Sequence, residues 1–284
     1  MAQMLSAGQE TPSSLRGDVI AEINFLNSPA DSSAPFVYVG EPPPGKPRRN
    51  YTESPHRVSL KDIRGHEVEY TLEADAFQIV RHVPSAMSYA MFHSDAEIRA
   101  VYYPEVEQLI LSNVLGAQKV LIFDHTIRKH DPGACRQPVS FAHVDQTPRA
   151  AEQRLRRSIA NPEEEGKLIR QRYRIINVWR PLNGQVESMP LSMASARSVE
   201  QTDLMPIQRI YTDFTGETMG VRYNHKQQWL YLSQMANDER ILLQCTDSKC
   251  GIRAGAPHAA FRDPRSPENA KPRESIEVRA LVFD

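Results

Sequence analysis

Three side chains that can bind a metal ion lie in two segments with the pattern of β-strands. His143 and Asp145 are separated by one residue in the apolar run 138–147, and His258 opens a second candidate strand much further along the chain. Side chains at positions i and i+2 of a strand point to one face, so His143 and Asp145 can reach the same point in space. Two histidines and one carboxylate on one face of an octahedron bind Fe(II) and leave the other positions open for a chelating co-substrate and O₂. The alternative interpretation of so short a pattern is a buried histidine paired with a neighbouring acid.

A second pattern near the end of the sequence could hold such a co-substrate. Arg273 and Ser275 stand at the start of the last candidate strand, 274–284. Arginine suits a planar, bidentate grip on a carboxylate, and with a hydroxyl two residues on it could clamp the far carboxylate of 2-oxoglutarate. Arg279 would share the face of Arg273 in a regular strand and is the alternative anchor, although Arg273 is favoured. The arginine that is not the anchor is expected to pair with Glu274, Glu277 or another acid.

Many short apolar segments separated by turn signals follow Gly116 and must position these side chains. A charged helix divided at Pro162 is expected over 148–172, among candidate strands. Such a series of short strands predicts an antiparallel sandwich or barrel. The candidate strands are 119–128, 138–147, 174–182, 186–194, 207–213, 217–224, 228–235, 239–247, 256–263 and 274–284.

The N-terminal third of the sequence has a different texture. Strands are predicted over 17–27 and 34–40, a proline-rich surface loop over 41–57, a hairpin over 58–74, and a helical region over 75–115. Within that helical region Ser94 is a capping residue, and Pro104 predicts a break or kink. Because no internal repeat or long linker interrupts the chain, we expect one domain over 1–284, in which 1–116 elaborates a core formed by 117–284.

Composition excludes several classes of protein. The chain has 34 lysines and arginines against 35 acidic residues, which argues against a basic nucleic-acid-binding protein. No apolar run approaches the length of a membrane span, and the N-terminal segment lacks the apolar stretch of a signal peptide. Cys135, Cys245 and Cys250 suit neither a disulfide framework nor a zinc site. A cytoplasmic location is therefore expected.

Six runs spread over residues 60–284 resemble one known family. They are LKDIRG (60–65), FDHTIR (123–128), HVDQT (143–147), NVWRPL (177–182), PHAAF (257–261) and PRESIEVR (272–279). The sequence resembles the Fe(II)/2-oxoglutarate-dependent oxygenases, and within them the mainly fungal hydroxylase/desaturase family of the aspergillic-acid-pathway type. That family also contains a gibberellin desaturase and proteins similar to a component of cephamycin methoxylation, so its members act on very different small molecules.

The resemblance implies a mainly β fold with flanking helices, the double-stranded β-helix or jelly roll. It also implies that His143, Asp145 and His258 bind Fe(II) and that Arg273 with Ser275, or else Arg279, binds 2-oxoglutarate. The implied reaction uses O₂ and 2-oxoglutarate to oxidise an unactivated C–H bond of a small secondary metabolite by hydroxylation, desaturation or ring formation. Expected partners are that substrate, 2-oxoglutarate and O₂, with no nucleic acid or membrane, while the substrate and the oligomeric state are not predicted.

Some further residues have both a structural and a functional interpretation. Asn177 could hydrogen-bond 2-oxoglutarate. Residues that could line the substrate pocket are Arg128, Trp179, Arg180 and Tyr231, with core packing or solvation as the alternative for each. His125 is expected to be structural, because adjacent strand residues face opposite sides and Asp124 and His125 cannot both bind one ion. The basic run 154–157 is expected to be a solvated helix face balanced by the acidic residues 163–165.

Two rival functions come from other classes of protein. A non-catalytic jelly-roll partner subunit or binding protein could use the pocket without chemistry, but it would need neither the His-Asp-His set nor the Arg-x-Ser run. A zinc hydrolase could use the same metal ligands but has no use for a carboxylate clamp.

Overall fold

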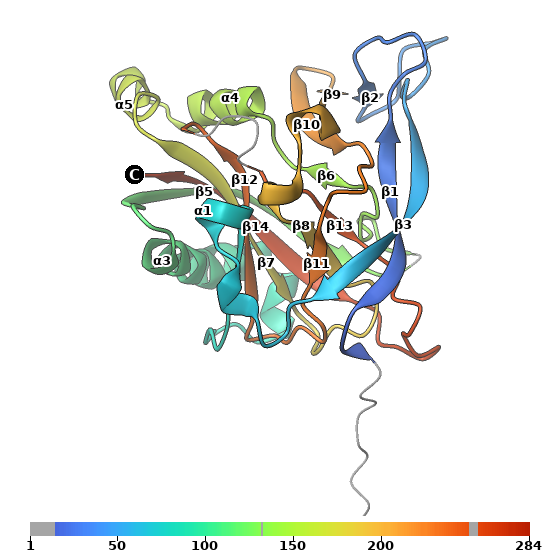
Figure 1. Cartoon of the computed structure of the whole chain (residues 1–284). Helices are drawn as coiled ribbons and strands as arrows, with labels where there is room; N and C mark the ends of the chain where they lie inside the picture. Colours follow the sequence, from blue (N-terminus) through green and yellow to red (C-terminus); the bar gives the residue numbers. More distant parts are fainter. Residues whose placement is uncertain (1–14, 132, 250–254) are drawn as a thin grey trace, which may run out of the picture.

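Two β-sheets form most of the protein. The computed structural model describes residues 15–131, 133–249 and 255–284 (Figure 1). The nine-stranded sheet has the order β1 (Val19–Asn27), β3 (Thr52–Asp62), β11 (Trp229–Tyr231), β8 (Leu191–Ala194), β13 (His258–Ala260), β6 (His143–Val144), β10 (Thr215–Val221), β9 (Leu204–Ile210) and β2 (Phe36–Tyr38). The five-stranded sheet has the order β4 (Phe77–Val80), β12 (Arg240–Asp247), β7 (Tyr173–Pro181), β14 (Glu274–Phe283) and β5 (Lys119–Lys129).

The path of the chain between the sheets defines a jelly roll. Strands β5, β7, β12 and β14 lie in the five-stranded sheet, whereas β6, β8, β11 and β13 lie in the other, so the chain crosses repeatedly from one sheet to the other. Within the five-stranded sheet all neighbours are antiparallel. This alternation is the double-stranded β-helix, and the expected fold class is confirmed.

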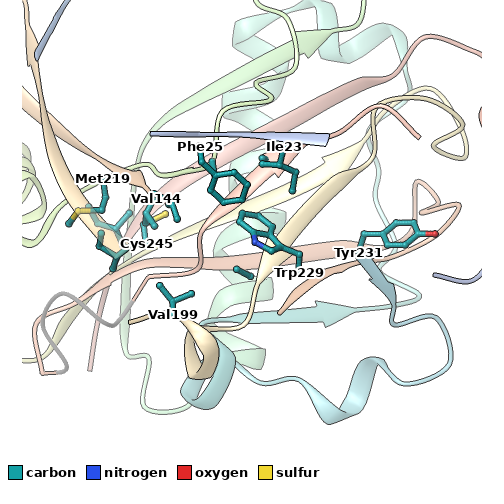
Figure 2. Close-up of a cluster of buried hydrophobic side chains, with 14 of the residues drawn as sticks. Ile23, Phe25, Val144, Val199, Met219, Trp229, Tyr231 and Cys245 are labelled. Atoms are coloured by element: carbon teal, nitrogen blue, oxygen red, sulfur yellow. The ribbon is translucent and has the colours of Figure 1, made fainter. Parts of the chain in front are cut away.

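The space between the sheets is filled by two apolar clusters, one of which is drawn in Figure 2. Trp229 from the nine-stranded sheet packs edge-on against Phe25 of β1, with ring centroids 5.6 Å apart. Val144 and Met219 approach Cys245 of the opposite sheet in the same cluster. This core fixes the two faces from which the site is built. Cys250 lies outside the described residues, and Cys135 is exposed.

Another apolar cluster covers the outer face of the five-stranded sheet. Helix α3 (Tyr103–Asn113) places Val106, Leu109 and Ile110 against the outward residues of β7 and β14. Pro104 stands in its first turn, where no intrahelical N–H bond is needed. The preceding turn is a π-helix, Ile98–Tyr102, so the predicted break at Pro104 is the junction of two helical segments.

The remaining helical segments are short. They are η2 (Glu67–Glu69), α1 (Leu72–Asp75), η3 (Ala90–His93), α2 (Asp95–Glu97), α4 (Pro148–Ser158), α5 (Pro162–Leu168), η5 (Ala196–Ser198) and η6 (Gln201–Asp203). Helix α4 is capped by Thr147, whose hydroxyl accepts a hydrogen bond from the Ala150 amide. Among the described residues no helix has the length and apolar character needed to cross a membrane.

Three local predictions for the N-terminal third are wrong. Residues 52–57 belong to β3 rather than to a loop, and no hairpin forms over 58–74, because β3 pairs with β1 instead. Pro55 is tolerated because Asn24, its partner on β1, gives its own N–H and C=O to Ser140 and Ala142. The predicted helical region 75–115 begins with β4, which extends the five-stranded sheet.

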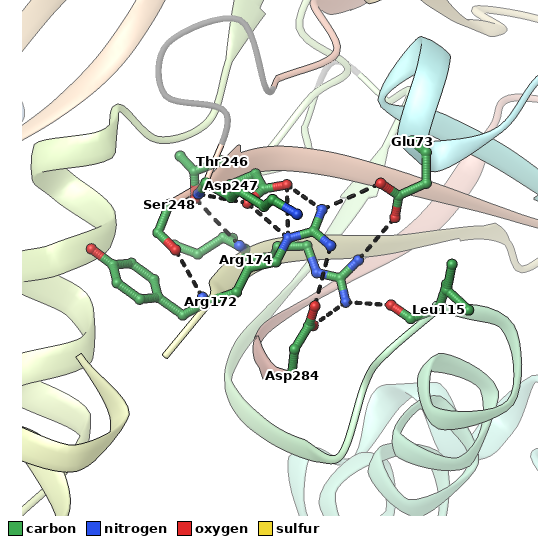
Figure 3. Close-up of polar contacts among 11 residues, drawn as sticks. Glu73, Leu115, Arg172, Arg174, Thr246, Asp247, Ser248 and Asp284 are labelled. Carbon is green, nitrogen blue, oxygen red and sulfur yellow. Dashed lines mark hydrogen bonds and ion pairs between the residues drawn. The ribbon is translucent and has the colours of Figure 1, made fainter. Parts of the chain in front are cut away.

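Charged residues join the ends of neighbouring strands in the five-stranded sheet (Figure 3). The fully buried Arg174 of β7 pairs with Asp284 and Glu73 and donates to the Leu115 carbonyl at 2.9 Å. Arg172 pairs with Asp247 at the end of β12. These contacts tie β7 and β12 to α1 and to the turn that follows α3.

Truncation of the central tryptophan should show how much its inter-sheet cluster stabilises the fold. We expect Trp229→Ala to lower the free energy of unfolding by about 3–5 kcal/mol, the usual cost of a large aromatic cavity. Chemical denaturation monitored by circular dichroism measures this. The exposed Val68→Ala is the control and should stay within about 0.5 kcal/mol, and an equal effect of the two changes would contradict the assigned core.

Candidate metal centre

The register of the nine-stranded sheet brings the two histidines together. His143 on β6 is directly opposite His258 on β13, and their ring centroids are 4.5 Å apart. Asp145 follows β6 immediately, with its Oδ1 3.4 Å from His143 Nε2. One ligand atom of each residue lies within 4.8 Å of the others. The three side chains can therefore share a single ion, as the i, i+2 pattern predicts.

Backbone carbonyls orient both imidazole rings. His143 Nδ1 donates to the Phe141 carbonyl at 2.7 Å, and His258 Nδ1 donates to the Ala256 carbonyl at 3.0 Å. A carbonyl only accepts hydrogen bonds, so each Nδ1 carries the proton and each Nε2 lone pair is free. This outer-shell arrangement is typical of metal-binding histidines. Burial, and then the neighbouring His143, lower the pKa of His258, which favours the neutral form that binds metals.

The carboxylate of Asp145 is held from behind by two side chains. Arg279 Nε donates to its Oδ2 at 2.7 Å, and the Asn177 amide donates to the same oxygen at 2.8 Å. Burial works to raise the pKa of Asp145, but the charge of Arg279 holds it well below its usual range. Asp145 is therefore ionised, with Oδ1 left toward the histidines.

Arg279 is fully engaged with acceptors. Besides Asp145 it pairs with Glu277 and Asp124 and donates to Thr126 Oγ1 at 3.0 Å. Arg279 and Glu277 belong to β14, with Asn177 opposite Arg279 on β7 and Asp124 opposite it on β5. A guanidinium with this many partners is suited to positioning a carboxylate rather than to gripping a free ligand.

A small cavity of about 30 Å³ connects the histidines with Arg273. Arg273 is only 2% exposed, lies 5.4 Å over the Trp179 ring, and donates to the Met189 carbonyl. Within the described residues, its Nε and the Ser275 hydroxyl are buried and have no hydrogen-bond partner. Burial and the nearby Arg128 lower the pKa of Arg273 to about 9, partly offset by Glu277. A carboxylate would supply what this guanidinium and hydroxyl lack, so the residues fit 2-oxoglutarate.

A second, larger cavity of about 760 Å³ lies on the other side of His143 and Asp145. His143, Arg128 and Thr126 line both cavities. An ion on the triad would therefore contact the small cavity and the large one at once, as a co-substrate and a substrate require.

The other predicted residues lie in different places: some line a cavity, some contact Asp145, and some do neither. Of the residues predicted for the substrate pocket, Arg128 lines both cavities, whereas Trp179 lines only the small one. Asn177, a candidate contact for 2-oxoglutarate, and Arg279, the alternative anchor, both donate to Asp145. Thr126 and Glu277 also line the small cavity, and no motif marked them as pocket residues.

Arg180 and Tyr231 line neither cavity, which corrects their predicted place in the substrate pocket. Adjacent strand residues face opposite sides, so Arg180 points away from Trp179, donates to Ser85 and lies over the Phe92 ring. The Tyr231 hydroxyl donates to the Gly17 carbonyl at 2.6 Å, and its ring packs against Phe261.

His125 stays apart from the triad, as expected of a structural residue. Its Nδ1 is hydrogen-bonded to the Tyr103 hydroxyl at 2.9 Å.

Comparison with known proteins gives the same class of protein as the geometry. Residues 23–283 match the family described as "Oxidoreductase/YMDC permease-like domain". The chain is 34% identical to the hydroxylase/desaturase poxK of Penicillium oxalicum, over 94% of this chain and 92% of that protein. It is 30% identical to the Fe(II)/2-oxoglutarate-dependent dioxygenase nvfI of Aspergillus novofumigatus, over 93% and 96%.

Solved structures extend the comparison to the fold. A variant of the iron and alpha-ketoglutarate-dependent endoperoxidase NvfI superimposes with a TM-score of 0.86 at 28% identity, covering 95% of this chain and 98% of that one. A jelly roll with a His-Asp-His site defines an oxidoreductase that uses Fe(II) and 2-oxoglutarate. The chain belongs to the Fe(II)/2-oxoglutarate-dependent oxygenases, among the hydroxylase/desaturases of fungal secondary metabolism.

The contact between Arg279 and Asp145 can be tested through metal affinity. We expect Arg279→Ala to weaken Fe(II) binding about 10- to 100-fold, the usual effect of losing an outer-shell partner. Arg279→Lys should recover part of this loss because it keeps the charge without the fork of donors. Anaerobic Fe(II) titration followed by calorimetry measures the affinity without turnover. Unchanged affinity in Arg279→Ala would show that Asp145 is positioned by other groups.

Proposed function

We propose that this protein oxidises an unactivated C–H bond of a small metabolite at an Fe(II) ion held by His143, Asp145 and His258. The observation that carries the proposal is the position of the triad between two cavities, one leading to an unpaired buried arginine and one of substrate size. Hydroxylation, desaturation and ring formation are all outcomes of this chemistry. The likeness to enzymes named hydroxylase/desaturase and endoperoxidase supports the assignment at the level of reaction class.

The chain's own residues divide the work around the ion. Arg273 and Ser275 bind the distal carboxylate of 2-oxoglutarate and thereby fix its orientation toward the triad. Arg279 and Asn177 hold Asp145 so that its Oδ1 faces the two Nε2 atoms. When bound, Fe(II) and 2-oxoglutarate supply the oxidising equivalents that the side chains themselves lack. The walls of the large cavity orient the substrate, which determines which C–H bond reacts.

The proposal also covers the domain organisation, location and partners of the chain. We propose that residues 1–284 act as one domain, in which β1 to β4 extend both sheets of the core. The chain would work in the cytoplasm on a small molecule, with 2-oxoglutarate and O₂ as co-substrates and without nucleic acid or a membrane.

The metal assignment can be tested by removing each histidine. We expect His143→Ala and His258→Ala to abolish substrate-dependent succinate formation and to remove the visible charge-transfer band that forms anaerobically with Fe(II) and 2-oxoglutarate. The physical reason is that each change deletes one of only three protein ligands. His125→Ala, on a histidine outside the triad, should keep the band. If the unaltered protein forms no band, a binding protein or zinc hydrolase replaces this proposal.

The co-substrate anchor can be tested by titrating 2-oxoglutarate. We expect Arg273→Ala to raise the apparent Michaelis constant for 2-oxoglutarate by about two to three orders of magnitude. Losing one partner of a buried charge pair costs several kcal/mol, and each tenfold change corresponds to about 1.4 kcal/mol. Arg273→Lys should restore only part, because lysine lacks the planar fork. Arg279→Ala serves as the comparison and should mainly weaken the binding of Fe(II). The reverse pattern, with 2-oxoglutarate sensitive only to Arg279, would make Arg279 the anchor.

A further inference from the structure

The walls of the large cavity carry more positive than negative charge. Five arginines from four segments line it in addition to Arg279: Arg128 on β5, Arg136, Arg154 and Arg157 on α4, and Arg209 on β9. The acids in the same walls are Asp124, Asp145 and Glu217. The balance of charge therefore depends on which of these groups are already paired within the protein.

All three acids are engaged by groups other than these five arginines. Asp124 and Asp145 both form ion pairs with Arg279. Glu217 pairs with Arg149 and accepts a hydrogen bond from Thr147. By contrast, within the described ranges none of the five arginines has a carboxylate within ion-pair distance. The cavity thus holds several arginines without a counter-ion.

Two of these arginines are supported by aromatic rings rather than by acids. Arg154 lies 4.6 Å over the Phe123 ring and Arg157 lies 4.6 Å over the Phe214 ring. Stacking supports the flat face of a guanidinium and leaves its N–H edge available for a carboxylate. Burial and the charge of Arg157 lower the pKa of Arg154, so this cation would gain from an anionic neighbour.

The prediction of a solvated face over 154–157 holds only in part. Arg156 and Arg157 are both exposed, and Arg156 pairs with Glu152 and Glu165, whereas Arg154 is half-buried. Arg154 and Arg157 line the large cavity, and α4 itself lies beside β10 (Figure 1).

Other parts of the cavity wall are aromatic. Tyr211 stacks on Phe214 with centroids 4.3 Å apart, and Tyr51 stacks on Phe141 with centroids 6.1 Å apart. Arg209 shares β9 and its following turn with Tyr211, and its charge also acts on the Tyr51 hydroxyl. The lining of the large cavity thus combines arginines that lack an acidic partner among the described residues with flat aromatic rings.

We propose that the substrate is an amphipathic carboxylate, with an apolar ring system bound by the aromatic residues and an acid group bound by Arg154, Arg157 and Arg209. This inference rests on the proposed function, because it takes the large cavity to be the substrate site. A carboxylate there supplies the counter-ion that the walls lack and matches the bidentate geometry of arginine. It also leaves Arg273 in the small cavity for 2-oxoglutarate, so the two acids bind at separate sites.

A pair of fluorescent probes that differ only in charge tests this inference. 1-Pyrenebutyrate and neutral 1-pyrenebutanol are titrated against the full chain with Fe(II) and saturating 2-oxoglutarate under anaerobic conditions, with fluorescence anisotropy as the readout. We expect pyrenebutyrate to bind at least tenfold more tightly than pyrenebutanol. Arg154→Gln and Arg209→Gln should each weaken the binding of pyrenebutyrate about tenfold and leave the binding of pyrenebutanol unchanged. Arg156→Gln, on the same helix but paired outside the cavity, should alter neither.

Several results would overturn the inference. They are equal binding of the two probes, absence of pyrenebutyrate binding, or identical behaviour of Arg154→Gln, Arg209→Gln and Arg156→Gln. The charge-transfer band, recorded in the same samples, tests the proposed function separately. A normal band without charge-selective binding would contradict only the proposal of an amphipathic carboxylate substrate. Charge-selective binding without the band would contradict the proposed oxygenase function but still support an anion-binding site in the large cavity.

Discussion

The ion pair between Arg279 and Asp145 is the contact on which the arrangement of the site depends. Asp145 stands just beyond the end of a two-residue strand, so the β-ladder alone does not fix its side chain. Arg279 and Asn177, from the opposite sheet, hold one carboxylate oxygen and leave the other toward the histidines. The two sheets of the jelly roll are thus joined at the metal centre by a buried charge as well as by the apolar core. Such a contact is worth most where water is excluded, because the local dielectric is low.

Arg279 on β14 and Arg273, just before this strand, have different surroundings. Arg279 is flanked across the sheet by Asp124 and Asn177, and its charge is balanced by Asp124, Asp145 and Glu277. Arg273 has a backbone carbonyl and an aromatic ring as neighbours. A balanced guanidinium positions another side chain, whereas an unbalanced one in a cavity is ready for an anion. Residue type and spacing alone do not separate these two cases.

The sequence therefore indicates the candidate metal ligands more completely than it indicates the strands and contacts around them. His143 and Asp145 could be linked from spacing, because the i, i+2 rule operates within one short segment. The contact of Asp145 with Asn177 and Arg279 could not, because it requires knowing that β6 faces β7 and β14 across the barrel. The strand β4 was missed for a similar reason: its four residues sit in a region of helical periodicity, and only pairing with β12 makes them a strand.

The same limit explains the arginines of the large cavity. In the sequence, residues 154–157 are a charge run followed by acids, and local pairing is the simplest interpretation. That interpretation holds for Arg156, which has an acid four residues before it on the same helix face. Arg154 lies over the ring of Phe123 on β5, and Arg157 lies over the ring of Phe214 in the turn before β10, so both stack on rings that carry no charge. Arg157 uses its Nε on the Gln153 carbonyl, but a ring contact consumes no N–H donor, so the terminal N–H groups of both arginines can still bind an anion. Neither ring contact can be read from the sequence.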